Sequence, residues 1–115
     1  RNTPIDLIGK TSLEEFVGIV SNLNVLVAND SGPLHTAVAL GVKTVSIFGP
    51  VDDLVYGPYP KDDNQIVIKE DLSCRPCYNN FRLSKDCINN RKCLDGITVA
   101  EVFSAVKKLI CKFPF

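Results

Sequence analysis

The chain has 115 residues, of which 45% are hydrophobic and 23% charged, and its formal net charge is zero. A neutral chain without basic clusters is not expected to bind nucleic acid, and no apolar run approaches the roughly 20 residues that a membrane span needs. The length allows one domain with a modest core. Because the chain contains no methionine, we expect a processed product or a piece of a larger protein.

The first periodic segment predicts a helix that starts after residue 12. Ser12 and Glu15 have the spacing of a capping box, in which each side chain accepts the other residue's backbone N–H. Residues 1–10 precede this helix as a connection or a short edge strand. Apolar residues recur at helical spacing and predict one buried face; they are Leu13, Phe16, Val17, Val20 and Leu23.

Two valine-bearing runs predict neighbouring parallel strands. Residues 25–28 and 44–48 are mostly apolar without strict alternation, which is typical of strands covered on both faces. The small apolar residues between them predict a helix that Gly41 ends as a left-handed cap. The order helix, strand, helix, strand indicates an α/β fold with a Rossmann-like parallel sheet and flanking helices.

The 29–35 loop, Asn-Asp-Ser-Gly-Pro-Leu-His, joins the first of these strands to the helix. Pro33 suits the first helical position, where no backbone N–H is needed. We expect the N–H groups of Ser31, Gly32 and Leu34 to point out of the helix start, where the helix dipole favours an anion. The loop therefore predicts a cradle for a phosphate or diphosphate.

Two ionisable side chains stand at the rim of this predicted cradle, Asp30 and His35, which is the one histidine of the sequence. Ligands of such sheets bind beyond the carboxyl ends of the strands, and the 29–35 loop and residues 49–52 both lie there. An ordinary helix cap made by Asp30 or Ser31 is the alternative interpretation, since capping residues are common at helix starts.

The second half of the chain begins with a long loop. Residues 49–64 are rich in glycine, proline and aspartate, with one helical turn expected around residues 52–56 and Asp52 and Asp53 expected as loop caps. A loop of this length in a compact domain is more often functional than idle. Residues 65–69 then predict a third, short strand.

A final helix is predicted over residues 98–111. Thr98 and Glu101 form a second capping box at its start. Its predicted buried face consists of Val99, Val102, Phe103, Val106 and Ile110.

The segment 70–95 is polar and irregular, and it carries four of the five cysteines: Cys74, Cys77, Cys87 and Cys93. The first pair has the spacing of a zinc knuckle and the second pair does not. One zinc ion, two disulfides and free thiols are the three interpretations. We favour a local staple or reduced thiols over a metal site, and the odd cysteine count favours a reducing compartment. Thiol catalysis is not expected, because the single histidine belongs to the other site.

Several of these segments together resemble glycosyltransferase family 9, the ADP-heptose:lipopolysaccharide heptosyltransferase family. The 29–35 loop, the helix after it, the strand to residue 48 and the Gly49-Pro50 step resemble the family pattern. Residues 9–13, the step at residues 57–59 and the cysteine-bearing tail resemble it further. The similar segments occur in the family's order over nearly the whole chain.

The resemblance implies a GT-B enzyme, in which two Rossmann-like halves face each other across a cleft. Residues 1–115 are similar to a single donor-side domain fragment of the C-terminal half. The acceptor half is absent from this chain. The family's inverting transfer implies no metal and no cofactor, with the general base on the absent half. We therefore expect the chain alone to be catalytically silent, and its sequence does not identify a catalytic residue.

Residue by residue, the resemblance implies a site for the donor sugar and its diphosphate. Asp30 would accept hydrogen bonds from sugar hydroxyls. The backbone amides of Ser31 and Gly32, with the Ser31 hydroxyl, would hold the diphosphate beside Pro33. His35 would lie in the first helical turn near the same phosphates. A pure cap at Asp30 and a packing role for His35 remain the alternatives.

The implied partners are an ADP-heptose-like nucleotide-sugar donor and, through the absent half, a lipopolysaccharide core or another glycan as acceptor. We expect the parent enzyme in the cytoplasm, and association with the cytoplasmic face of the inner membrane is compatible with the resemblance. A different GT-B-like nucleotide-sugar enzyme, such as an epimerase, is one alternative. A non-catalytic interaction module held by its cysteine segment is another. An exposed sheet edge predicts self-association.

Overall fold

The computed structural model describes residues 2–79, 82–83 and 87–111. Its first half contains α1 (Leu13–Ser21), β1 (Val25–Asn29), α2 (Gly32–Ala39) and β2 (Lys43–Phe48). Its second half contains α3 (Asp53–Tyr56), β3 (Gln65–Lys69), β4 (Tyr78–Asn79), β5 (Arg82–Leu83), α4 (Lys92–Asp95) and α5 (Val99–Cys111).

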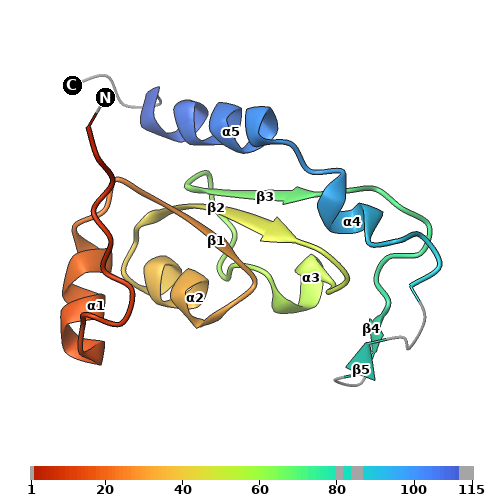
Figure 1. Ribbon diagram of the computed structural model, residues 1–115, viewed down its shortest axis with the longest axis horizontal. Coiled ribbons are helices and arrows are strands. Elements are labelled where there is room, and N and C mark those ends of the chain that lie inside the picture. The colour runs from red at the N-terminus through yellow and green to blue at the C-terminus, as the bar shows by residue number, and fades with distance from the viewer. Residues whose placement is uncertain (1, 80–81, 84–86, 112–115) are drawn as a thin grey trace.

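The centre of the fold is a parallel sheet in the order β1-β2-β3 (Figure 1). Val27 pairs with Val45, and Val45 pairs with Ile66 on the other side. The predicted α/β fold with a Rossmann-like parallel sheet is confirmed. All three strands end at the same edge, where the loops that precede α2 and α3 begin.

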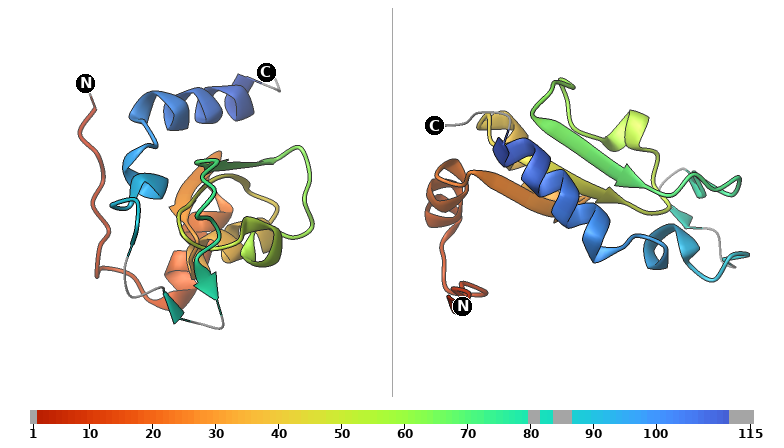
Figure 2. Two further views of the ribbon diagram at one scale, coloured as in Figure 1. Left: turned by 90° about the vertical axis from the view of Figure 1, so that its right-hand side faces the viewer. Right: turned by 90° about the horizontal axis from the view of Figure 1, so that it is seen from above.

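Helices cover both faces of the sheet, with α1 and α2 on one side and α5 on the other (Figures 1 and 2). One core cluster joins Val20 of α1 to Ala37 of α2 and to Val42. The other joins Val45 of β2 to Ala105 and Leu109 of α5. The central strand β2 is buried along most of its length, as expected of a strand covered on both faces, whereas β1 and β3 are only partly buried.

The capping box of α1 is confirmed, but its buried face is narrower than predicted. The Glu15 N–H donates to Ser12 Oγ at 3.1 Å, and the Ser12 N–H donates to Glu15 Oε2 at 2.8 Å. Val20 is buried, whereas Leu13 is 74% exposed. The helix packs mainly against α2, and Phe16 of its first turn joins the Val20 cluster, while Leu13 stays exposed.

The capping box of α5 is also confirmed, and its buried face is rotated from the predicted one. The Thr98 N–H donates to Glu101 Oε2 at 2.7 Å. Ala105 and Leu109 are buried and the predicted Val102 and Val106 pack beside them. The other three predicted members are exposed: Val99, Phe103 and Ile110. The apolar stripe of α5 is wider than the surface that packs against the sheet. Periodicity alone therefore selected apolar residues at the exposed side of the stripe.

Smaller expectations are resolved by the backbone. Residues 2–10 form a connection without strand pairing. Gly41 has a φ of +73°, which confirms the left-handed cap after α2. The expected helical turn is α3, and β3 lies where the third strand was predicted. Among the described residues, no helix is long and apolar enough to cross a membrane.

Candidate functional site

The 29–35 loop leaves the carboxyl end of β1 and turns directly into α2. Leu34 has no exposed surface, and neither has Ala37 one turn later. These two side chains fix α2 against the sheet, so the residues just before Leu34 are held at the edge where ligands of parallel sheets bind. Helix α2 begins at Gly32, which puts Pro33 at its second position and not at the first.

The start of α2 has no side-chain cap. Ser31 is the residue before the helix and is extended, with φ −164° and ψ 167°, but its side chain accepts no N–H from the helix. Its hydroxyl instead donates to the backbone oxygen of Asn29 at 3.1 Å. The capping interpretation is therefore wrong for Ser31, although serine is one of the best capping residues.

Two of the three predicted N–H groups remain open. The Leu34 N–H donates to Ser31 O at 3.1 Å, so this tight first turn removes it from the predicted anion cradle. Within the described part of the chain, the N–H groups of Ser31 and Gly32 have no hydrogen-bond partner. They lie at the positive end of the helix dipole, where an anion is favoured.

The fold itself gives no reason for a glycine at position 32. The φ of Gly32 lies outside the left-handed region, and a Cβ built there would meet no atom within 4 Å. A side chain would therefore fit, and helix starts accept most residues. The open space above this backbone is suited to a group from outside the chain, because only glycine lets such a group approach closely.

Asp30 and His35 lie beside each other at the start of α2. His35 Nε2 lies 3.8 Å from Asp30 Oδ1, with 49% of the histidine side chain and 27% of the aspartate side chain exposed. The distance is longer than a hydrogen bond, and both side chains reach solvent. His35 is the fourth residue of α2, so it lies in the first turn, and its exposure argues against a packing role.

Asp53 was predicted as a loop cap and this is wrong, whereas Asp52 does cap α3 through the Leu54 N–H at 2.9 Å. Asp53 is only 5% exposed. Its carboxylate accepts hydrogen bonds from Lys69 Nζ at 2.8 and 3.0 Å, and Arg75 lies 3.8 Å away. Burial by itself would raise the pKa of Asp53, but the hydrogen bonds and charge of Lys69, together with the charge of Arg75, hold it below its ordinary value.

Arg75 is the functional neighbour that sequence reasoning missed. Its guanidinium is 8% exposed and donates to three backbone oxygens, those of Gly49, Val51 and Glu70. The cysteine-bearing segment is thereby tied to the loop that follows β2. Its position between two cysteines carried no visible signal, because its partners lie up to 26 residues away in the sequence.

The family model described as glycosyltransferase family 9 (heptosyltransferase) matches residues 1–87. The chain belongs to glycosyltransferase family 9. The resemblance stated from the sequence is thus confirmed. In the matched region lie both edge loops, with the open start of α2 and the Asp53 cluster.

Named relatives of this family 9 chain are heptosyltransferases. Lipooligosaccharide heptosyltransferase 2 from Campylobacter jejuni is 30% identical over 90% of this chain and 31% of its own length. Lipopolysaccharide heptosyltransferase 1 from Pseudomonas aeruginosa is 29% identical over 77% of this chain and 24% of its own length. The chain thus spans about a third or less of these relatives.

A solved structure agrees with the fold of this family 9 chain. The crystal structure of the glycosyltransferase family 9 protein from Veillonella parvula superposes with a TM-score of 0.67 and 26% identity. The match covers 91% of this chain and 28% of that protein. The three-stranded sheet and its helices are therefore an arrangement that a family 9 protein contains.

The cysteines of this family 9 chain are free thiols. Cys93 is buried, Cys74 and Cys77 are half-buried, and Cys87 and Cys111 are exposed. Among the described residues, no three side chains of the metal-ligating types are placed to hold a metal ion. The sequence favoured a local staple or reduced thiols, and the structure has the second of these two forms.

Proposed function

We propose that this chain is the nucleotide-sugar donor-binding portion of a glycosyltransferase that acts in lipopolysaccharide core or related glycan synthesis. The observation that carries the proposal is the uncapped start of α2. The N–H groups of Ser31 and Gly32 have no hydrogen-bond partner among the described residues, and a Cβ built on Gly32 would meet no atom within 4 Å. Both residues lie in the loop that resembles the family's donor motif. The names of the relatives, all heptosyltransferases, support a heptose or a related sugar as the transferred group.

In this proposal the diphosphate of the donor lies against the amides of Ser31 and Gly32. Pro33 contributes a fixed φ and no N–H, so the helix start stays rigid beneath the ligand. The Ser31 hydroxyl joins the site by rotating away from the Asn29 oxygen that it contacts at 3.1 Å. An anion at this position gains from the helix dipole without any other positive charge.

Asp30 and His35 take different parts of the donor. A carboxylate is a fixed acceptor for sugar hydroxyls, and Asp30 would repel the diphosphate if it pointed at it. His35 donates a hydrogen bond to a phosphate oxygen from its place beside Asp30. Their 3.8 Å separation places the acceptor and the donor group side by side at the rim, which matches the boundary between sugar and phosphate.

The chemical step of the parent enzyme would be attack of an acceptor hydroxyl on the anomeric carbon, with departure of the nucleoside diphosphate. The leaving diphosphate gains negative charge, and preorganised N–H donors stabilise that charge in the transition state. The described residues supply this stabilisation. The acceptor glycan and the base that removes its proton belong to the remainder of the parent, so this chain alone binds the donor without transfer.

A glycine exchange tests the proposal with a matched control inside the chain. Gly32 and Gly18 both have open space around an added Cβ, but Gly18 lies in α1 away from the loop. We expect ADP and an ADP-sugar to bind the wild type and Gly18→Ala with equal affinity, measured by calorimetry. Gly32→Ala places a methyl group where the diphosphate approaches, so its affinity falls at least tenfold.

Adenosine distinguishes phosphate recognition from base recognition in the same assay. Adenosine lacks the diphosphate, so its binding is weak and unaffected by Gly32→Ala. Equal ADP affinity of Gly32→Ala and the wild type would contradict the proposal.

The alternative that the parent is an epimerase is tested by analysing the products of the full-length parent. The location of that parent in the cytoplasm stays a prediction.

A further inference from the structure

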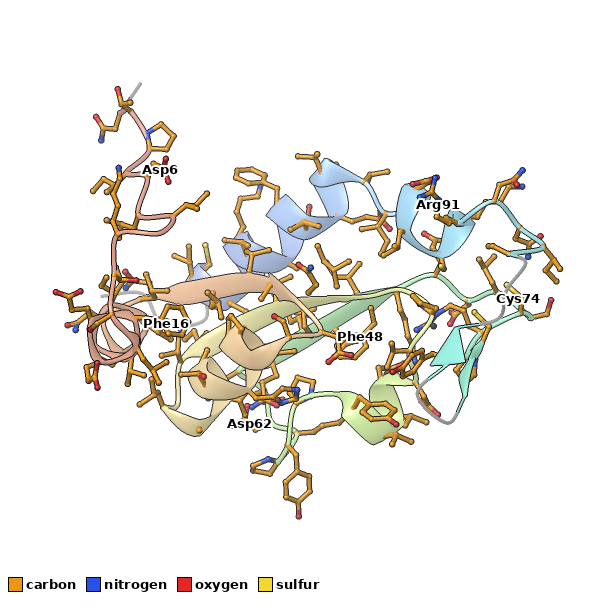
Figure 3. All side chains as sticks on the ribbon, turned by 60° about the horizontal axis from the view of Figure 1, so that its bottom comes forward. Asp6, Phe16, Phe48, Asp62, Cys74 and Arg91 are labelled. Atoms are coloured by element: carbon orange, nitrogen blue, oxygen red, sulfur yellow. The ribbon has the colours of Figure 1, made fainter. Side chains whose placement is uncertain are left out.

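The cysteine segment brings together residues that are distant in the sequence. Cys74 and Arg91 lie at the same end of the molecule (Figure 3). The side-chain amide of Asn89 donates to Cys74 Sγ at 3.2 Å, across 15 residues. Residues 87–93 are therefore folded back against residues 74–77, and the proposed donor site makes no use of either stretch.

The backbone around Cys87 is shaped to surround its sulfur. The Arg91 N–H donates to Cys87 Sγ at 3.1 Å. Asn90 and Arg91 both have positive φ, 48° and 60°, which is uncommon for residues other than glycine. Backbone strain of this kind persists where the surrounding structure enforces it, and it is concentrated at functional sites.

The two N–H groups near Cys87 favour its ionised form. Hydrogen bonds from the backbone of Arg91 and of Asn89 hold the pKa of Cys87 below the ordinary thiol value. The side chain is exposed. A thiolate is the nucleophilic form of cysteine, so an accessible thiol that ionises more readily reacts faster at neutral pH.

The other thiols of the segment have a different environment. Burial raises the pKa of Cys93, and the neighbouring thiols of Cys77, Cys87 and Cys74 raise it further, because several thiolates side by side repel one another. Cys87 is therefore an exposed thiol with a lowered pKa, whereas Cys93 is buried and its pKa is raised.

We propose that Cys87 is a thiol-modification site that attacks low-molecular-weight disulfides and is then resolved by Cys74. Asn89 identifies the pair, because it lies in the turn that the Arg91 N–H closes on Cys87 Sγ and its side-chain amide donates to Cys74 Sγ. Exchange of this kind proceeds through a mixed disulfide.

The two steps balance with oxidised glutathione as the oxidant. The Cys87 thiolate attacks one glutathione sulfur, the glutathione S–S bond breaks, and one glutathione thiolate leaves. The Cys74 thiolate then attacks the Cys87 sulfur, forms the internal disulfide and releases the second glutathione thiolate. The protein loses two electrons and two protons, and oxidised glutathione becomes two molecules of the reduced form.

The internal disulfide would act on the edge loop beside the proposed donor site. The N–H groups of Cys77 and Tyr78 both donate to Pro50 O, at 3.0 and 3.2 Å. Arg75 binds the oxygens of Gly49 and Val51 from the same segment. A covalent link from Cys74 to Cys87 would therefore restrain the loop after β2 through contacts that already exist.

Mass spectrometry of the chain treated with oxidised glutathione tests the proposal. We expect the wild type to lose two hydrogens, with a peptide map that joins Cys74 to Cys87. Cys74→Ser should instead retain one glutathione on Cys87, because the resolving thiol is absent. Cys87→Ser should form neither product. Cys111→Ser is the matched control, since Cys111 is exposed but outside the cluster, and it should behave as the wild type does.

Competing alkylation with iodoacetamide at neutral pH gives a second measurement that needs no disulfide. Cys87 should be modified several times faster than Cys111. Equal rates at the two cysteines, or a disulfide that joins Cys74 to Cys77, would overturn the proposal. Stoichiometric zinc in protein purified without added metal would overturn it too, because the sulfurs would then be metal ligands.

Discussion

The loops that follow β1 and β2 lie at the same edge of the sheet, but they differ in whether their polar backbone groups have hydrogen-bond partners. After β1, the helix start keeps the N–H groups of Ser31 and Gly32 without a partner among the described residues. After β2, Arg75 satisfies the oxygens of Gly49 and Val51. The first loop is open toward an external ligand and the second is closed by the chain itself.

The two aspartates of these loops show the same contrast. Asp30 is partly exposed, and its Oδ1 lies 3.8 Å from His35 Nε2. Asp53 is buried and held by Lys69 at 2.8 Å. A buried and fully paired carboxylate stabilises a scaffold, because leaving it unpaired is costly, whereas a loosely held one at a rim is available to a ligand. We therefore expect the loop after β1 to bind the ligand and the loop after β2 to stabilise the fold.

The largest expected effect comes from breaking the closed loop. Arg75→Met removes the donor to three backbone oxygens and one charge beside Asp53. We expect the free energy of unfolding to fall by roughly 2–4 kcal/mol, because buried acceptors are left unsatisfied. Urea titration measures this, and Lys92→Met, an exposed cation in the same segment, is the control. If the free energy of unfolding falls no further than in the control, Arg75 does not stabilise this loop.

The pH dependence of stability tests the paired state of Asp53. The pKa of Asp53 is lowered in the folded state, so the unfolded chain binds its proton first as the pH falls. Its stabilising contribution is present above the unfolded value and is lost as the pH falls through the folded value, below about pH 4. The wild type should therefore lose stability more steeply there than Asp53→Asn in thermal melts. Parallel curves for the two proteins would argue against the paired state of Asp53.

Gly32→Ala should sharpen the comparison by separating stability from binding. The added Cβ meets no atom and the φ is ordinary, so the substitution raises stability by roughly 0.5 kcal/mol through the unfolded chain. The same protein should bind ADP more weakly. A thermal melt beside the calorimetry measures both effects, and a destabilised Gly32→Ala would show that the glycine serves the fold.

The smallest effect on stability is expected for Asp30→Asn. The side chain is a rim residue without a hydrogen bond in the described structure, so the free energy of unfolding should change by less than about 0.5 kcal/mol. Binding of ADP should be unchanged or slightly stronger, since a negative charge is removed. The advantage of an ADP-sugar over ADP should disappear. An unchanged preference for the sugar would remove Asp30 from the proposed site.

The features that were predictable from sequence are those with local causes. Two capping boxes, the left-handed Gly41 and the apolar strands depend on residues a few positions apart, and all were confirmed. The parallel order then followed from the alternation of helices and strands. The loop before α2 was placed at the correct edge for the same reason.

The features that were missed depend on contacts between distant residues. Asp53 meets Lys69 and Arg75 across 16 and 22 positions, and nothing in the local sequence distinguishes it from the capping Asp52. The buried face of α5 depended on which side met the sheet. The hydrogen bond from the Leu34 N–H to Ser31 O was missed for a different reason. A first turn closed by a bond between residues three apart has the same sequence pattern as an ordinary α-helical turn.

The most direct test of the open loop is an amide NMR titration of the chain with ADP and an ADP-sugar. We expect the largest chemical-shift changes at the amides of Ser31 and Gly32 and smaller changes at His35. The chemical shifts of the amides near Arg75 should not change. Saturating ADP that leaves Ser31 and Gly32 unshifted, or that shifts the Arg75 segment instead, would contradict the assignment of donor binding to the start of α2.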